Sequence, residues 1–253
     1  MRTPVGMLGI ILLCIFPSVI WICLDQAVWT FDPAWYGQVT CELFNALASF
    51  RVQDWWELLH TAFGIKAPAI AWLGQFLVPL GYLFGRVEAG LLWLNILSQV
   101  WSAWLLGRSV WIVTQDAWAA RLAVLIFCTA PFFVAMNHVY FVEPLQTLAV
   151  SMMIYLHARG FGVVWPVQLG LSAGVLAFGM AVKASSPLYL VVPSLGVFTQ
   201  VVLTFRKKAC VEKAPRLSMV MLILSGLMIM LTVIWYQTNW DTLVAFIRTT
   251  SSG

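Results

Sequence analysis

The chain has 253 residues, of which 62% are hydrophobic and 9% are charged, and its mean hydropathy is +0.90. This composition excludes an ordinary soluble domain and predicts an all-α, polytopic membrane helix bundle. The formal net charge of +4 is small and scattered, so no nucleic-acid partner is expected. The five cysteines form no CxxC or Cys/His cluster, which argues against a zinc site or a disulfide framework.

The first apolar run, residues 5–24, follows Arg2 and predicts a first span with a cytoplasmic N-terminus. The run is longer than a usual signal-peptide core and has no small-residue cleavage site, so we expect it to be uncleaved. Residues 25–66 form the longest polar stretch and predict the first outer loop. Within this loop, residues 34–50 are typical of an amphipathic juxtamembrane helix.

Six further apolar runs are long enough to cross a bilayer. They are residues 88–107, 118–136, 141–157, 164–182, 187–205 and 217–236. Another run, residues 67–84, is short and holds two prolines and two glycines, so we predict a juxtamembrane helix that does not cross. The result is about seven spans, with residues 1–240 as one transmembrane module and residues 241–253 as the start of a truncated outer loop.

This topology places one set of basic residues in the cytoplasm, in agreement with the positive-inside rule. They are Arg108, Arg159, Arg206, Lys207, Lys208, Lys213 and Arg216. The outer face receives most of the acids, namely Asp25, Asp32, Glu42, Asp54, Glu57, Glu88, Glu143 and Asp241. Lys66, His138 and Lys183 join the acids there. Ionisable groups at a membrane edge are costly, so this mixed set is a candidate functional site.

Several motifs occur in order along the chain. They are Asp32-Pro-Ala-Trp-Tyr-Gly, Asp54-Trp-Trp, Lys66-Ala-Pro-Ala-Ile-Ala-Trp-Leu, Pro131…Asn137-His138…Glu143-Pro144-Leu145, Gly179-Met-Ala-Val-Lys183 and Trp235-Tyr236-x-x-Asn239. Together they resemble the GT-C superfamily of polytopic glycosyltransferases, in the branch of protein O-mannosyltransferases and aminoarabinose transferases. The chain departs from that pattern where Pro33 replaces a second acid and where Lys66 precedes Ala-Pro rather than Pro-Pro. Family members also usually continue with further spans.

The resemblance implies an inverting glycosyltransferase that moves a sugar from a polyprenyl-phosphate donor to an acceptor hydroxyl at the outer face. The acceptor would be a protein, lipid or glycan, and the setting a bacterial inner membrane. Asp32 would be the general base, and Lys66 and Lys183 would bind the donor phosphate. The expected substrate-binding residues are Glu143, His138 and Tyr36. The resemblance implies no cofactor, and it leaves open whether a divalent metal takes part.

The same residues have structural alternatives. Asp32 suits a helix N-terminus, and Lys66 and Lys183 suit interfacial anchors that reach the headgroups. Glu143 suits a cap of the fourth span, and His138 an ordinary interfacial residue. The alternative function is a non-catalytic polytopic protein, such as an inactive glycosyltransferase module, an assembly partner or a transporter subunit. The predicted spans hold almost no charge at mid-membrane, which favours surface chemistry over transport.

Overall fold

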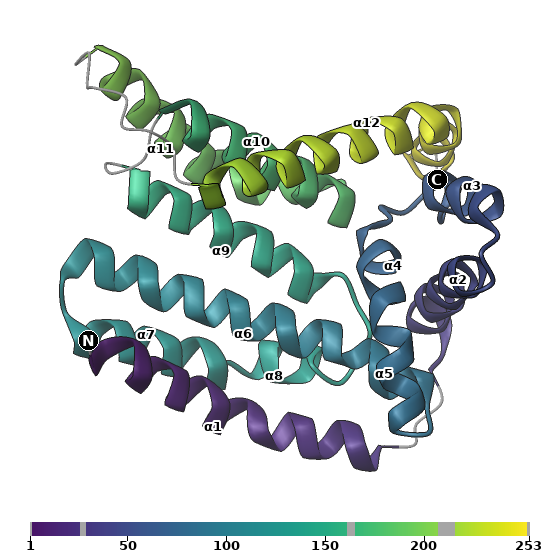
Figure 1. Ribbon diagram of the computed structural model, residues 1–253, viewed down its shortest axis with the longest axis horizontal. Coiled ribbons are helices and arrows are strands. Elements are labelled where there is room, and N and C mark those ends of the chain that lie inside the picture. Colours follow the sequence, from purple (N-terminus) through teal and green to yellow (C-terminus); the bar gives the residue numbers. More distant parts are fainter. Residues whose placement is uncertain (1, 26–28, 161–164, 207–215, 252–253) are drawn as a thin grey trace.

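The computed structural model describes residues 2–25, 29–160, 165–206 and 216–251, and every regular element in these ranges is helical (Figure 1). This confirms the all-α prediction. The elements are α1 (Arg2–Leu24), α2 (Phe31–Ala48), α3 (Val52–Thr61), α4 (Ala69–Gly74), η1 (Gln75–Leu77), α5 (Val78–Leu83), α6 (Val87–Thr114), α7 (Ala117–Thr129), α8 (Pro131–Met136), α9 (Glu143–Arg159), α10 (Trp165–Val182), α11 (Ser186–Arg206) and α12 (Arg216–Ser251).

The longer helices pack side by side into a bundle (Figure 1). Helix α6 is central, because it packs against α1, α7 and α9. Helix α9 packs in turn against α10 and α11, and α12 covers α10. A second group of helices, α2, α3, α4, η1 and α5, lies at one end of the bundle, and we call this group the end cap. The predicted juxtamembrane helix at residues 34–50 corresponds to α2.

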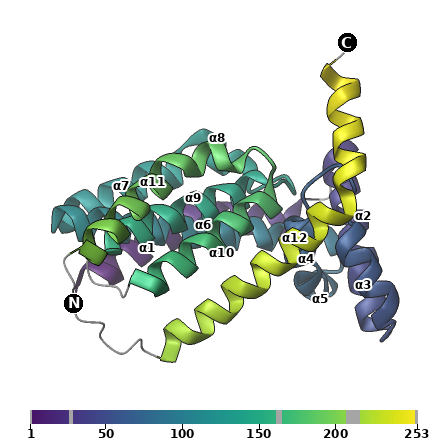
Figure 2. The same ribbon diagram turned by 90° about the horizontal axis from the view of Figure 1, so that it is seen from above.

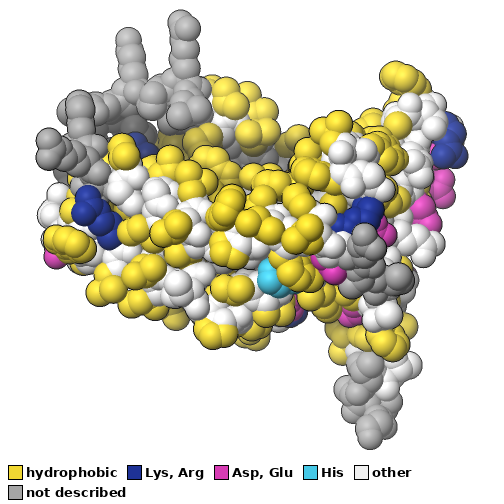
Figure 3. Space-filling model, turned by 90° about the horizontal axis from the view of Figure 1, so that it is seen from below, with side chains coloured by type: hydrophobic (Ala, Val, Ile, Leu, Met, Phe, Trp, Pro, Cys, Tyr) yellow, Lys and Arg dark blue, Asp and Glu magenta, His cyan; other side chains and the backbone are white. Residues whose placement is uncertain are grey.

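Four helices in the described part of the chain are long and apolar enough to cross a membrane. Their apolar segments are Pro4–Leu24, Val87–Thr114, Ser186–Leu203 and Met219–Thr249. The protein is therefore a helical membrane protein, and the remaining predicted spans form shorter helices. Figure 3 agrees with this assignment, because hydrophobic side chains cover the middle of the face it shows and charged side chains gather toward its ends.

The predicted span at residues 118–136 is divided into α7 and α8 at Ala130 and Pro131. Ala130 has extended backbone angles because a residue before proline is disfavoured in the helical region. At 1.5 Å per residue, α7 alone is about 20 Å long, less than the roughly 30 Å of a hydrocarbon core. Residues 67–84 form three consecutive helical elements, α4, η1 and α5, and the junctions between them keep helical backbone angles.

The last helix, α12, runs from Arg216 to Ser251, whereas the sequence predicts a span that ends at residue 236. Figure 2 shows that this helix changes direction, and its C-terminal part lies next to α3 in the end cap. Two hydrogen bonds hold it there. The Trp235 indole nitrogen donates to the Ala62 carbonyl at 2.9 Å, and Asn239 Nδ2 donates to the His60 carbonyl at 2.8 Å.

Charged residues divide between the two ends of the bundle. The described acids other than Asp116 lie in the end cap, or in helix ends and a part of α12 close to it. Asp116 caps the start of α7 at the opposite end, where Arg108 and Arg159 also lie. The predicted cytoplasmic residues Lys207, Lys208 and Lys213 lie outside the described residues, as does Glu212. The gathering of acids at one end is thus a property of the fold.

Candidate functional site

Asp32 and Lys66 form an ion pair within the end cap. Asp32 lies in the first turn of α2, and its Oδ1 atom is 2.6 Å from Nζ of Lys66, in the segment between α3 and α4. A carboxylate in a first turn is favoured by the helix dipole. The Lys66 ammonium also lies 5.0 Å from the ring centroid of Trp35 and 5.1 Å from that of Tyr36. Three neighbours therefore fix the position of Lys66.

Glu143 and Lys183 form a second ion pair where α9 begins and α10 ends. Glu143 Oε1 lies 3.0 Å from Lys183 Nζ. Because α9 and α10 are consecutive and antiparallel, the start of one lies beside the end of the other. Both charges also have the sign that their helix ends favour. The second carboxylate oxygen of Glu143, Oε2, is buried and has no hydrogen-bond partner in the described chain.

Tyr36 lies between the two ion pairs. Its side chain is buried, and its ring contacts Phe63 and Phe141 edge-on, with centroids 5.2 and 6.1 Å away. Burial raises the pKa of Tyr36, and the negative charges of Asp32 and Glu143 raise this pKa further. The Lys66 ammonium lies 5.1 Å from the centroid of the Tyr36 ring, and Phe141, which contacts that ring, is two residues before Glu143, so both ion pairs lie near Tyr36. The fold thus brings together Asp32, Tyr36, Lys66, Glu143 and Lys183.

The backbone around this site contains unusual conformations. Phe63 and Gly64 both have a φ of +63°, and Phe31, immediately before Asp32, has a φ of +54°. A bulky residue in the left-handed region carries strain that the surrounding structure must offset. The contacts of the Phe63 ring with Trp35 and Tyr36 help to offset this strain. Such strain is common where a fold holds functional side chains in place.

His138, the sixth predicted site residue, lies in a different place. Its ring stacks on Trp21 at the end of α1, with centroids 4.1 Å apart. Burial lowers the pKa of His138, and the nearby charge of Asp25 partly opposes this effect. None of the contacts described for His138 reaches the two ion pairs, so its placement gives no support to the predicted substrate-binding role.

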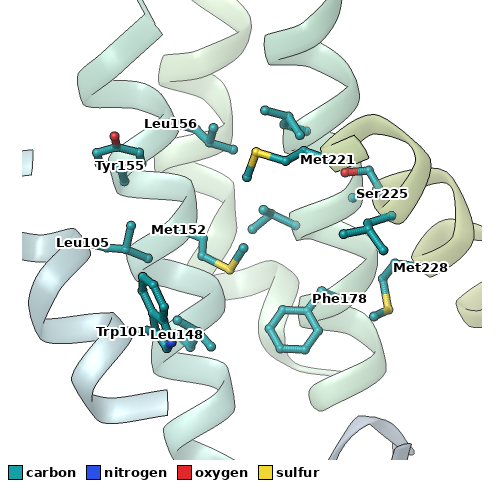
Figure 4. A pocket seen from close by; sticks show the side chains of 14 residues that line it. Trp101, Leu105, Leu148, Met152, Tyr155, Leu156, Phe178, Met221, Ser225 and Met228 are labelled. Atoms are coloured by element: carbon teal, nitrogen blue, oxygen red, sulfur yellow. The ribbon is translucent and has the colours of Figure 1, made fainter. Parts of the chain in front are cut away.

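An apolar cavity of about 480 Å³ lies between α6, α9, α10 and α12 (Figure 4). Its lining includes Trp101 and Leu105 from α6, and Met221 and Met228 from α12. On α9 the lining reaches Leu148, five residues from Glu143. On α10 it reaches Phe178, five residues before Lys183. Five helical residues correspond to about 7.5 Å, so the cavity extends along both helices toward the second ion pair.

Helix α6 carries a buried polar stripe that was not predicted from the sequence. Asn95, Gln99 and Ser102 follow one another at helical spacing and are all buried. Asn95 Nδ2 donates to the carbonyls of Met136 at 2.9 Å and Val139 at 2.6 Å, and so holds the segment that leads into Glu143. The signal was present, because these three polar residues, with Ser98 between them, recur at helical spacing within a largely apolar run.

Among the described residues, no three His, Cys, Asp or Glu side chains lie close enough together to hold a metal ion. The site therefore offers two carboxylates, two ammonium groups and an aromatic wall to a ligand. Such groups can bind a phosphate and accept a proton. The chain matches no family model, no curated protein and no solved structure.

Proposed function

We propose that the protein is a membrane glycosyltransferase that moves a sugar from a polyprenyl-phosphate donor to an acceptor hydroxyl at the outer face. The observation that carries this proposal is the position of two lysine–carboxylate pairs around Tyr36, close to one end of an apolar cavity. A donor with a long apolar chain and an anionic head needs both features. The cavity would take part of the chain, and the lysines would take the phosphate.

Each charged residue would then have a distinct role. Asp32 would take the proton from the acceptor hydroxyl as its oxygen attacks the anomeric carbon. The bond from that carbon to the donor phosphate would break, and the electron pair would remain on the phosphate oxygen. Lys66 and Lys183 would stabilise this developing charge. The Asp32 side chain is 47% exposed, so an acceptor can reach it, whereas the Glu143 side chain is 26% exposed and would orient Lys183.

Under this proposal the end cap faces the periplasm of a bacterium and the N-terminus is cytoplasmic. The resemblance to GT-C enzymes in the end-cap motifs supports this orientation, as does the placement of Arg108 and Arg159 at the opposite end. The acceptor would be a protein, lipid or glycan that approaches from the aqueous side.

The test uses the full chain in liposomes that contain undecaprenyl phosphate-linked sugars, with release of undecaprenyl phosphate as the readout. We expect Asp32→Asn to lower the rate by roughly 10²- to 10⁴-fold, which is the usual contribution of a general base. Lys183→Met should also lower the rate. The matched control is Asp54→Asn, which removes an exposed end-cap acid paired with Arg51 at 3.0 Å and should leave the rate unchanged. Equal rates for Asp32→Asn and the parent would remove Asp32 as the base.

The second candidate is a non-catalytic polytopic protein, and one observation favours it. Each candidate acid is already paired with a lysine, so the pairs also suit a purely structural role that joins α2 to the α3–α4 segment and α9 to α10. Absence of transfer by the parent with a panel of such donors and acceptors would favour this second candidate.

A further inference from the structure

A small cavity of about 10 Å³ lies between α6, α7, α8 and α9, beside the middle of α6. It is distinct from the larger apolar cavity and from the two ion pairs. Its polar lining residues are Gln99, Ser102, Asn137 and Thr147, and its apolar ones are Phe127, Phe133, Met136 and Pro144. A polar lining at this depth is costly in a membrane protein, which raises the question of what it binds.

Three polar atoms of this lining are buried and lack a hydrogen-bond partner in the described chain. They are Oε1 and Nε2 of Gln99 and Oδ1 of Asn137. The two residues are only 4% and 1% exposed, so bulk water does not satisfy them. Exchanging the oxygen and nitrogen of the Gln99 amide changes nothing, because both atoms lack a partner. Since nearly all buried polar groups in proteins are paired, these atoms point to a small bound ligand.

The two hydroxyl groups of the lining are oriented as acceptors. Ser102 Oγ donates to the Ser98 carbonyl at 2.7 Å, and Thr147 Oγ1 donates to the Glu143 carbonyl at 2.9 Å. Each hydroxyl hydrogen is thus used within its own helix, and the oxygen lone pairs remain. The cavity therefore offers one amide donor, several acceptor oxygens and no ionised side chain.

We propose that this cavity is a binding site for a single water molecule. A water molecule would accept a hydrogen bond from Gln99 Nε2 and donate to Asn137 Oδ1 and to one hydroxyl oxygen, and so would pair two of the three atoms. The size agrees, because a volume of roughly 10–15 Å³ on this measure holds one water molecule. A cation fits less well, because half of the lining is apolar and the amide N–H would repel it.

The bound water would connect three parts of the bundle. Gln99 belongs to α6 and Asn137 to the segment between α8 and α9. Asn137 also donates through Nδ2 to Ser18 Oγ of α1 at 3.5 Å. The polar bridge therefore runs from α1 through the bound water to α6, at a depth where lipid offers no alternative hydrogen-bond partner.

The test is radiolytic hydroxyl labelling of the full chain in lipid nanodiscs, read by mass spectrometry. Hydroxyl radicals form from water at the point of irradiation, so side chains beside an internal water molecule are oxidised. We expect labelling of Met136 and Phe133, and much less of Met153, which is fully buried and does not line the cavity. The variants Gln99→Leu and Ser102→Val should reduce labelling of the two lining residues relative to the parent, and the labelling that remains should be the part due to their own partial exposure.

The matched control is Gln168→Leu. It removes another buried glutamine, one that hydrogen-bonds to Gln200 and does not line the cavity, and should leave the labelling of Met136 unchanged. Ser102→Val fills the cavity and retains Gln99. If Gln99→Leu fails to fold, the labelling of Met136 in Ser102→Val still tests whether a water molecule occupies the cavity. The proposal is overturned if Met136 is labelled no more than Met153 in the parent, or if Ser102→Val does not reduce the labelling of Met136 relative to the parent.

Discussion

The two lysines of the candidate site are held to different degrees. Lys66 has a carboxylate at 2.6 Å and two aromatic rings, and its side chain is 29% exposed. Lys183 has one carboxylate at 3.0 Å, and its side chain is 42% exposed. Among the described contacts Lys183 has fewer partners than Lys66, so less opposes a change of partner by Lys183 than by Lys66. We therefore expect an incoming phosphate to bind first to Lys183.

A single residue outside the site gives a prediction about pH. Burial against Trp21 lowers the pKa of His138 from its ordinary value near 6.5, so the unfolded chain binds this proton more readily than the folded chain. The stability that a neutral His138 contributes is present above a pH of about 6.5 and is lost as the pH falls through the lower, folded-state pKa.

We therefore expect His138→Phe, which keeps a ring against Trp21 but does not titrate, to lose less stability than the parent on acidification. Unfolding in detergent is followed between about pH 7 and pH 5, the range in which histidine changes its charge. The difference between the two proteins isolates His138 from the acids that titrate in both. Parallel curves for the two proteins would contradict the prediction.

At the scale of elements, the packing of the end cap onto α6 depends on two glycines. A Cβ atom added at Gly90 of α6 would come within 2.4 Å of the backbone nitrogen of Gly81 in α5 and within 2.5 Å of the Leu77 carbonyl oxygen. Backbone atoms cannot move aside as a flexible side chain can. We therefore expect Gly90→Ala to separate α5 from α6 and to destabilise the fold by about 1–3 kcal/mol.

The matched control for Gly90→Ala is Gly226→Ala in α12, where an added Cβ meets no heavy atom within 4 Å. Alanine favours a helix over glycine by up to about 1 kcal/mol, so this variant should be neutral or slightly more stable. Urea or thermal unfolding of both variants in detergent gives the comparison. Equal effects of the two substitutions would show that the contact with α5 does not hold α6.

The apolar runs of the sequence predicted the existence of the helices but not their breaks or contacts. Run length follows from bilayer thickness, which is why α1, α10 and α11 begin and end close to their predictions, whereas α6 continues to Thr114, beyond its predicted end at residue 107. The contact between Glu143 and Lys183 could also be predicted, because in two consecutive antiparallel helices the start of the first lies beside the end of the second. The pairing of Asp32 with Lys66 could not be predicted from the sequence, because it depends on how α2, α3 and the left-handed turn at Phe63 fold together.

For the whole molecule, we expect the two ends of the bundle to face opposite sides of a membrane. Acids gather in and around the end cap, while Asp116 lies at the far end of the long helix α6. At 1.5 Å per residue, α6 is about 42 Å long, enough to separate these ends by a complete bilayer. The short helices α7 and α8 together return the chain to the end-cap side.

We therefore expect single cysteines introduced at Asp54 and Asp116, in a chain whose native cysteines are replaced, to react with a membrane-impermeant maleimide from opposite sides. In cells, Asp54→Cys should be labelled without permeabilisation and Asp116→Cys only after it, because the end cap is assigned to the outer face. Both positions are exposed, so failure to react is not explained by burial. Labelling of the two positions from the same side would contradict a bundle that crosses the membrane along α6, and labelling in the reverse order would retain the bundle but reverse its orientation.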